Sequence, residues 1–250
     1  MAQNEYTIKE LKGFSGSKIY LMKNDKGLFI RKMDNTDRNY IKLKELSKDF
    51  NVPKIYSYEN GVLDMEYIHG LDMKSYLSVR DTRRLTDFLI NILTFFSENK
   101  QMVDYTEIYK DRLKYIKLSS DTVFTKEQLF DKLPKILPRS KYFCDLTLEN
   151  IIYSEDGQFY LIDGMTSEYD SYIFDIAKLR QDLECKWFLR NTKLYLDVKV
   201  ENIQDKLLEK FELANNNYLL ILMLLRVYRY ATSGSLEEQF LIKEMNRLWK

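Results

Sequence analysis

A predicted β-hairpin in the middle of the chain constrains the fold most strongly. Two short, apolar, β-prone runs, residues 151–153 and 159–162, flank a Glu-Asp-Gly turn at residues 155–157. Apolar runs joined by such a turn are typical of a hairpin. Because a hairpin brings its two ends together, we expect Asn150 at its start and Asp163 at its end to lie side by side.

Asp145 lies five residues before Asn150, on the loop that leads into the hairpin. Two carboxylates and one amide near a hairpin mouth offer oxygen ligands to a hard cation such as Mg²⁺, and they leave one carboxylate to act as a base. Magnesium-dependent phosphoryl transfer needs this set of groups. The spacing D-x-x-x-x-N is common by itself, and the hairpin and the second aspartate make it informative.

At these residues the chain resembles the aminoglycoside phosphotransferase and choline kinase superfamily. The catalytic loop of that family reads His-Gly-Asp-x-x-x-x-Asn, and its metal-binding aspartate follows a short hairpin. The resemblance implies an α+β, bilobal protein-kinase-like fold, with an N-terminal antiparallel sheet plus one helix and a mostly helical C-terminal lobe. It also implies that Asp145 is the catalytic base, that Asn150 and Asp163 bind Mg²⁺, and that Asp175 braces the catalytic loop from a helix.

The chain departs from the family pattern at three positions. Phe143 and Cys144 replace His-Gly, so Phe143 must support the loop by packing, and Cys144 is interpreted as a small buried filler. Gly164 stands where relatives often have an aromatic residue. None of these changes removes a group that touches metal, phosphate or acceptor, so an active enzyme is preferred over a pseudokinase.

The first 66 residues predict the strand-strand-strand-helix-strand-strand order of a kinase N-lobe. We therefore expect residues 1–66 to form the N-lobe and residues 67–250 to form the C-lobe, which holds the catalytic loop, the metal site and the acceptor-binding helices. The predicted strands are 6–12, 18–22, 28–31, 52–58 and 62–65, and the predicted helix is 38–50. Further helices are predicted at 172–183, 201–212, 216–230 and 236–249, and Thr125 begins a capping box. The longest apolar run, residues 218–225, is interpreted as part of a buried helix.

The resemblance places the nucleotide in the N-lobe. The expected phosphate-covering loop contains Gly13, Ser15, Gly16 and Ser17, because glycines let backbone N–H groups approach phosphates. Strand alternation lets only one of Arg31 and Lys32 face the cleft. The family pattern favours Arg31 as the phosphate-binding cation, with Lys32 facing solvent. Glu45 is either the partner of this cation or a solvated surface charge.

The segment Met-Glu-Tyr-Ile-His-Gly at residues 65–70 resembles the hinge of the family. By this resemblance the carbonyl of Glu66 and the N–H of Ile68 read the adenine edge, and ATP is the default phosphoryl donor. Main-chain recognition of this kind leaves GTP open as the donor.

Composition excludes several classes of protein. The 250 residues carry a net charge of +1, with 45% apolar and 31% charged residues, which fits a globular protein that does not bind nucleic acid. The two cysteines predict a reducing, cytoplasmic setting, and the single histidine excludes a multi-histidine metal site. We expect no signal peptide, no membrane span and no protein partner.

The acceptor is expected to be a hydroxyl of a small molecule, because Asp175 follows Asp163 too closely for a peptide-binding activation segment. Glu168 and Asp170 either bind the acceptor or form an ordinary acidic loop. Trp187, with Lys178 and Arg180, either reaches the acceptor or packs helices.

Residues 175–187 resemble a branch of the superfamily associated with bacterial surface-polysaccharide loci, which favours a sugar or sugar-like alcohol. Choline-like amino alcohols, aminoglycosides and a nucleotide-binding pseudokinase remain the alternatives.

Overall fold

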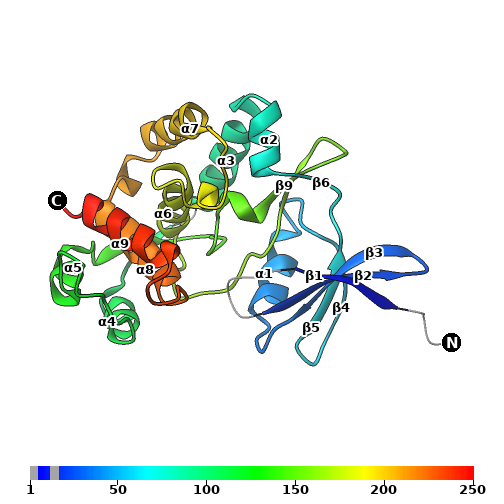
Figure 1. Cartoon of the computed structure of the whole chain (residues 1–250), viewed down its shortest axis with the longest axis horizontal. Coiled ribbons are helices and arrows are strands. Elements are labelled where there is room, and N and C mark those ends of the chain that lie inside the picture. The colour runs from blue at the N-terminus through cyan, green and yellow to red at the C-terminus, as the bar shows by residue number, and fades with distance from the viewer. Residues whose placement is uncertain (1–4, 12–16, 99) are drawn as a thin grey trace. The chain divides into compact units, whose positions relative to one another are not determined.

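The protein is described by a computed structural model that covers residues 5–11, 17–98 and 100–250. Its internal contacts divide the chain into two compact units (Figure 1). The first unit combines residues 1–76 with residues 149–167, and the second combines residues 77–148 with residues 168–250. Each unit is described separately below. The expected N-lobe of residues 1–66 stays a prediction.

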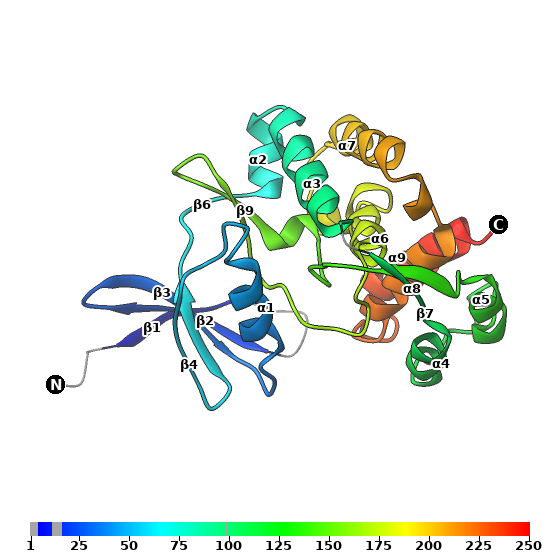
Figure 2. The same ribbon diagram turned by 180° about the vertical axis from the view of Figure 1, so that it is seen from behind.

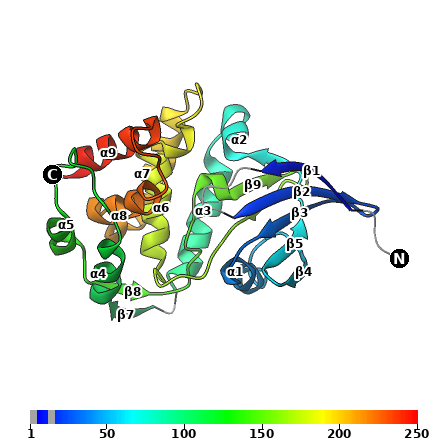
Figure 3. The ribbon, with the colours of Figure 1, turned by 60° about the horizontal axis from the view of Figure 1, so that its bottom comes forward.

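A five-stranded antiparallel sheet forms most of the first unit. Its strands lie in the order β1-β2-β3-β5-β4, and Figure 3 shows β1, β2 and β3 as neighbours. The helix α1 follows β3 in the chain, so the predicted order of strands and helix is confirmed. The bounds are Tyr6–Leu11 for β1, Lys18–Asn24 for β2, Gly27–Met33 for β3, Arg38–Leu46 for α1, Ile55–Glu59 for β4 and Val62–Glu66 for β5.

The apolar face of α1 packs on this sheet (Figure 2). Leu43 of α1 is fully buried against Leu63 and Met65 of β5. The rings of Tyr40 and Tyr58 stack with their centroids 4.4 Å apart. Burying aliphatic side chains contributes about 1.5–3 kcal/mol for each one, so this small core fixes α1 on the sheet.

A second, three-stranded sheet also belongs to the first unit. Its order is β10-β9-β6, where β6 is Gly70–Asp72, β9 is Ile151–Ser154 and β10 is Phe159–Leu161. The pair β9–β10 confirms the predicted hairpin, and Gly157 in its turn has a φ of 80°, which favours glycine. Gly70 is required by close approach, because a Cβ there would lie 2.2 Å from the carbonyl oxygen of Tyr153.

The second unit is mainly helical. Its helices are α3 (Arg83–Phe96), α4 (Thr106–Lys114), α5 (Lys126–Lys132), α6 (Tyr172–Leu183), α7 (Asp197–Lys210), α8 (Asn217–Tyr228) and α9 (Leu236–Leu248). It also contains the antiparallel pair of β7 (Gln101–Asp104) and β8 (Ile136–Arg139), which the sequence did not predict. The helix α2 is Met73–Val79, and short 3₁₀ turns lie at Leu148–Asn150, Trp187–Leu189 and Glu212–Ala214.

The helices α6 and α8 form the centre of this unit. Every residue of α6 is buried, and so is every residue from Leu219 to Leu225 in α8, as the apolar run predicted. The capping box of α5 is also confirmed, because the Thr125 hydroxyl accepts a hydrogen bond from the Gln128 N–H and the Gln128 side chain binds the Thr125 N–H. No helix in the described part of the chain is long and apolar enough to cross a bilayer.

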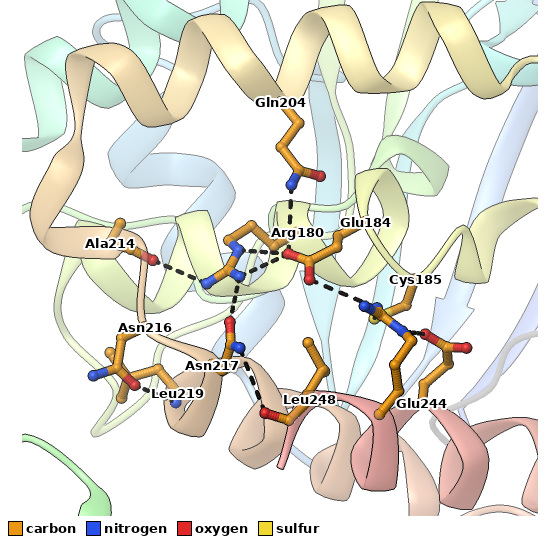
Figure 4. Close-up of polar contacts among 11 residues, drawn as sticks. Arg180, Glu184, Cys185, Gln204, Ala214, Asn216, Asn217, Leu219, Glu244 and Leu248 are labelled. Carbon is orange, nitrogen blue, oxygen red and sulfur yellow. Dashed lines mark hydrogen bonds and ion pairs between the residues drawn. The ribbon is translucent and has the colours of Figure 1, made fainter. Parts of the chain in front are cut away.

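A polar network inside the second unit links three helices (Figure 4). Arg180 of α6 donates to Glu184 one turn later and to Asn217 of α8, at 2.7 and 2.8 Å. It also donates to the carbonyl of Ala214 at 3.3 Å, and Gln204 of α7 donates to Glu184 at 3.4 Å. Buried polar groups with these partners fix how helices pack. Arg180 therefore packs helices, which was one of its two predicted roles.

Candidate active site

The predicted base, Asp145, lies on an irregular loop of the second unit that follows β8. The residues around it are buried, with Phe143 and Leu146 fully enclosed and Cys144 exposed by only 2%. The Asp145 side chain itself is 27% exposed. The Asp145 carboxylate is therefore accessible to a ligand, while the buried residues around it hold its backbone in place.

Two buried carboxylates of α6 hold this loop. One Asp175 carboxylate oxygen accepts a hydrogen bond from the Phe143 N–H at 2.6 Å, and one of Asp182 accepts from the Leu148 N–H at 2.7 Å. Both aspartates are fully buried. Asp175 thus contacts the loop of Asp145 from a helix, as the resemblance implies, and Asp182 is a second support that the sequence analysis did not identify.

Lys178 is a third contact from α6 to the loop. Its ammonium lies 3.0 Å from a carboxylate oxygen of Asp145, and its side chain is only 6% exposed. Residues at positions i, i+3 and i+7 of a helix share one face, so Asp175, Lys178 and Asp182 reach the loop together. Lys178 therefore keeps the Asp145 carboxylate in an oriented, charge-balanced pair.

Cys144 occupies a backbone conformation that favours glycine. Its φ is 81°, which costs a residue with a Cβ about 1–2 kcal/mol. Its carbonyl accepts a hydrogen bond from Arg226 of α8 at 3.2 Å. The glycine that the family pattern has at this position is thus replaced at a conformational cost, and the buried arginine contact holds the carbonyl in place.

The mouth of the hairpin lies in the first unit. The N–H of Ile162 donates to the carbonyl of Asn150 at 2.9 Å, so Asn150 and Asp163 leave the hairpin side by side, as expected from the turn. Both side chains are partly exposed. Asp163 has a φ of 63°, a left-handed conformation that aspartate tolerates better than most residues.

The expected orientation of Lys32 was wrong. Lys32 was expected to face solvent, but it is only 2% exposed and its ammonium forms an ion pair with Asp163. Arg31 points to the other face of β3 and pairs with Asp64 at 2.6 Å and with Glu5 at 3.0 Å. Hydrogen bonding to Asp64 raises the pKa of the Arg31 guanidinium. Strand alternation correctly allowed only one cation to face Asp163, and the family pattern selected the wrong one.

The helix α1 holds the segment after Asp163. The side-chain amide of Asn39, which is 2% exposed, donates to the carbonyl of Gly164 at 2.7 Å, and the Thr166 N–H donates to the carbonyl of Arg38 at 3.2 Å. Glu45 pairs with the buried Lys42 at 2.8 Å, whereas Arg31 takes Asp64 and Glu5 as partners. No sequence pattern identifies Asn39, because its partner is a backbone carbonyl far along the chain.

The hairpin mouth has the chemistry of a magnesium site. Asn150 and Asp163 carry oxygen atoms, which are the ligands that Mg²⁺ prefers, and this ion commonly takes only one or two protein groups plus water and phosphate. The oxygen atoms of Asn150 and Asp163 fit such an ion. Among the described residues, no group of three or more His, Cys, Asp or Glu could hold a metal ion.

The remaining residues predicted to bind the nucleotide belong to the expected phosphate-covering loop and to the expected hinge. Gly13, Ser15 and Gly16 lie outside the described residues. The hydroxyl of Ser17 donates to Asp34 at 3.2 Å. Glu66 ends β5, with its carboxylate bound to the Lys54 N–H at 3.1 Å, and Ile68 is buried.

The three residues expected to bind the acceptor have partners within the second unit. Glu168 pairs with Arg112, and Asp170 binds the Tyr105 hydroxyl at 2.7 Å and Arg139 at 2.8 Å. Trp187 is 4% exposed and packs on Phe240 and Arg190. Trp187 therefore packs helices, and both acidic side chains already have cationic partners.

Comparison with known proteins finds a similar fold among solved structures. The scan against protein-family models finds no match, and the search of curated proteins finds none. Among solved structures, choline kinase LicA from Streptococcus pneumoniae is similar with a TM-score of 0.62 and 20% identity, over 98% of this chain and 92% of that one.

Two further similar structures are an aminoglycoside phosphotransferase, APH(4)-Ia, and an ethanolamine kinase from Plasmodium vivax. The first has a TM-score of 0.66 and 8% identity over 98% of this chain and 94% of that one. The second has a TM-score of 0.57 and 13% identity over 99% and 82%. The chain therefore has the α+β fold of the aminoglycoside phosphotransferase and choline kinase-like proteins.

Proposed function

We propose that the chain is a Mg²⁺- and ATP-dependent phosphotransferase that moves the γ-phosphoryl group to a hydroxyl of a small molecule. The observation that carries this proposal is the buried Lys32 ammonium on the Asp163 carboxylate at the hairpin mouth. A buried cation next to a carboxylate and an amide can bind a phosphate chain and its metal ion, whereas a turn with only a structural role does not require a buried cation.

Asp145 is the proposed base. It accepts a hydrogen bond from the acceptor hydroxyl and takes its proton while the new O–P bond forms and the bond between the γ-phosphorus and the leaving ADP oxygen breaks. The products are a phosphate ester, ADP and one proton. Lys178 keeps the carboxylate oriented before the reaction. A base of this kind contributes about 10²–10⁴-fold to the rate.

Asn150 and Asp163 are the proposed ligands of Mg²⁺, which neutralises phosphate charge when it is bound. Lys32 is the proposed cation for the donor phosphates, in place of Arg31. A lysine ammonium suits this role because it acts as a compact point charge with three donors. Positioning of the phosphates and compensation of their charge account for most of the catalysis in this reaction class.

ATP is the proposed donor. One structure of LicA contains AMP, and one of APH(4)-Ia contains ADP and hygromycin B, which supports an adenine nucleotide. The carbonyl of Glu66 and the N–H of Ile68 are proposed to bind the adenine edge. Gly13, Ser15, Gly16 and Ser17 are proposed to cover the phosphates, in a cytoplasmic setting where ATP is available.

The proposed acceptor is a sugar or sugar-like alcohol of cell-surface polysaccharide metabolism. Amino alcohols and aminoglycosides are the alternatives, because the similar structures are named as kinases of such compounds. A nucleotide-binding pseudokinase is the other alternative, and the strained Cys144 beside Asp145 is the observation in its favour.

The test is Mg²⁺-dependent ADP formation from ATP across sugars, polyols and amino alcohols, with Asp145→Asn as the control. We expect turnover of one acceptor, and a fall of about 10²–10⁴-fold in kcat for the variant with nucleotide binding retained. Nucleotide binding without turnover of any acceptor, in both proteins, would instead favour the pseudokinase.

A further inference from the structure

Two cations of the second unit lie at the proposed base. Lys178 of α6 contacts the Asp145 carboxylate at 3.0 Å, and Arg226 of α8 binds the carbonyl of Cys144, the residue before it, at 3.2 Å. One carboxylate is therefore accompanied by two positive side chains. The ion pair with Asp145 explains why Lys178 lies at this carboxylate. It does not explain why a second positive charge, that of Arg226, lies beside the same loop.

The contacts of Arg226 are with neutral groups. Besides the Cys144 carbonyl, its guanidinium lies 3.4 Å from the sulfur of Met223, 3.6 Å from the sulfur of Cys144 and 5.1 Å from the centroid of the Tyr169 ring. Burial disfavours its charge, but Cys144 and the Asp145 carboxylate raise its pKa above the ordinary value. Arg226 is thus a half-buried, permanent cation whose hydrogen-bond partners carry no formal charge.

The nearby acidic residues are compensated by other cations. Glu168 pairs with Arg112, whose guanidinium lies 6.0 Å from the centroid of the same Tyr169 ring that Arg226 approaches. Asp170 is bound by Arg139 at 2.8 Å. The positive charge near Tyr169 would therefore repel a cationic acceptor and attract an anionic group.

We propose that the acceptor alcohol carries an anionic group, a carboxylate or a phosphate, and that Arg226 binds this group. The inference rests on the proposed function and names the class of its acceptor. Consecutive Cα atoms are about 3.8 Å apart, so a guanidinium on the carbonyl of residue 144 is within reach of a small molecule whose hydroxyl lies at Asp145. Arginine suits this role because its planar fork matches carboxylate and phosphate oxygens.

The test compares matched acceptors that differ only in charge. One set is glycerol, D-glycerate and sn-glycerol 3-phosphate, another is glucose, glucuronate and glucose 6-phosphate, and choline is the cationic probe. We expect kcat/KM at least tenfold higher for an anionic member than for its neutral counterpart. The carboxylate and phosphate members then distinguish the two anionic groups. Preference for a neutral alcohol or for choline would overturn the inference and leave the kinase function intact.

The variants separate acceptor binding from nucleotide binding. Arg226→Gln should raise the KM for the anionic acceptor at least tenfold, with the KM for ATP changed less than threefold, and Arg226→Lys should recover part of the loss. Arg229→Gln, an exposed arginine at the end of the same helix, is the matched control and should change neither constant. An unchanged acceptor KM in Arg226→Gln would contradict the assignment.

A binding measurement keeps the inference testable if no probe is turned over. At constant ionic strength, the anionic probes should raise the Tm of the wild type and of Arg229→Gln, and they should not raise the Tm of Arg226→Gln. Absence of turnover on every alcohol counts against the proposed function. Absence of any Tm increase with the anionic probes counts against the role of Arg226.

Discussion

The loop that carries Asp145 and the segment that carries Asp163 are held in different ways. Within the second unit, the loop is bound by Asp175 and Asp182 from a helix whose every residue is buried. Within the first unit, the segment depends on Lys32 and Asn39 at the edge of a much smaller core. The position of Asp145 is therefore tied to the stability of its unit, whereas the segment of Asp163 depends on a few polar contacts.

The largest effect on stability is expected from the buried carboxylates of the loop. Asp175→Ala leaves the N–H of Phe143 without its acceptor in a buried position and should lower the free energy of unfolding by about 1–3 kcal/mol. Urea unfolding measures this change. The exposed Asp205→Ala is the control and should stay within about 0.5 kcal/mol. Equal stabilities of the two variants would show that the loop is not held by Asp175.

The two cations of β3 provide the next comparison. Lys32→Met should lower kcat/KM for ATP by about 10–100-fold, because a hydrogen bond to a charged group contributes about 1.5–3 kcal/mol. Arg31→Met removes only a partly exposed pair with Asp64 and should change kcat/KM less than about threefold. Steady-state kinetics with ATP as the varied substrate tests both variants. A larger loss in Arg31→Met would restore the assignment made from the sequence.

A smaller effect is expected where α1 holds the segment after Asp163. Asn39→Ala removes a buried donor to the carbonyl of Gly164 and should cost about 1 kcal/mol of unfolding free energy. It should also raise the KM for ATP, because the segment carries a proposed metal ligand. Asn191→Ala, at an exposed turn, should change neither quantity. A stability loss without any change in KM would limit Asn39 to packing.

A further effect, confined to alkaline pH, is expected in the second unit. Burial raises the pKa of Tyr169 to about 12 from its ordinary value of 10.0. Because the pKa of Tyr169 is higher in the folded state, its hydroxyl contributes to the free energy of unfolding. This contribution is complete below pH 10 and is lost as the pH rises from 10 to about 12. Its slope is at most about 1.4 kcal/mol per pH unit. Tyr169→Phe should lose less stability than the wild type between pH 9.5 and about 11 in urea unfolding.

The same measurement on Tyr195→Phe is the control, because Tyr195 is 93% exposed. Its pH dependence should match that of the wild type. If Tyr169→Phe and Tyr195→Phe followed the same curve, the alkaline loss of stability would come from other groups.

Local patterns predicted the fold well. The hairpin turn, the capping box at Thr125 and the apolar run of α8 each depend on residues close in the sequence, and all three are confirmed. The pair β7–β8 was not predicted, because its partners lie more than thirty residues apart and Pro138 stands inside one strand.

The contacts of the candidate site were predicted only in part. The pattern singled out Asp145, Asn150, Asp163 and Asp175 as candidates, because their spacing is set by one loop, one hairpin and one helix. Helical spacing from Asp175 would also have identified Lys178 and Asp182, three and seven positions later. Arg226 and Asn39 could not be found in this way, since each binds a backbone carbonyl that belongs to a distant segment.

The two hydrogen bonds between α6 and the loop of Asp145 also affect hydrogen exchange. Loop amides usually exchange rapidly, because small local openings expose them to water. The N–H groups of Phe143 and Leu148 instead donate hydrogen bonds to buried carboxylates of α6, so they can exchange only when α6 and the loop separate. These two amides, which lie outside any long helix or strand, should therefore exchange as slowly as the amides in the centre of the second unit.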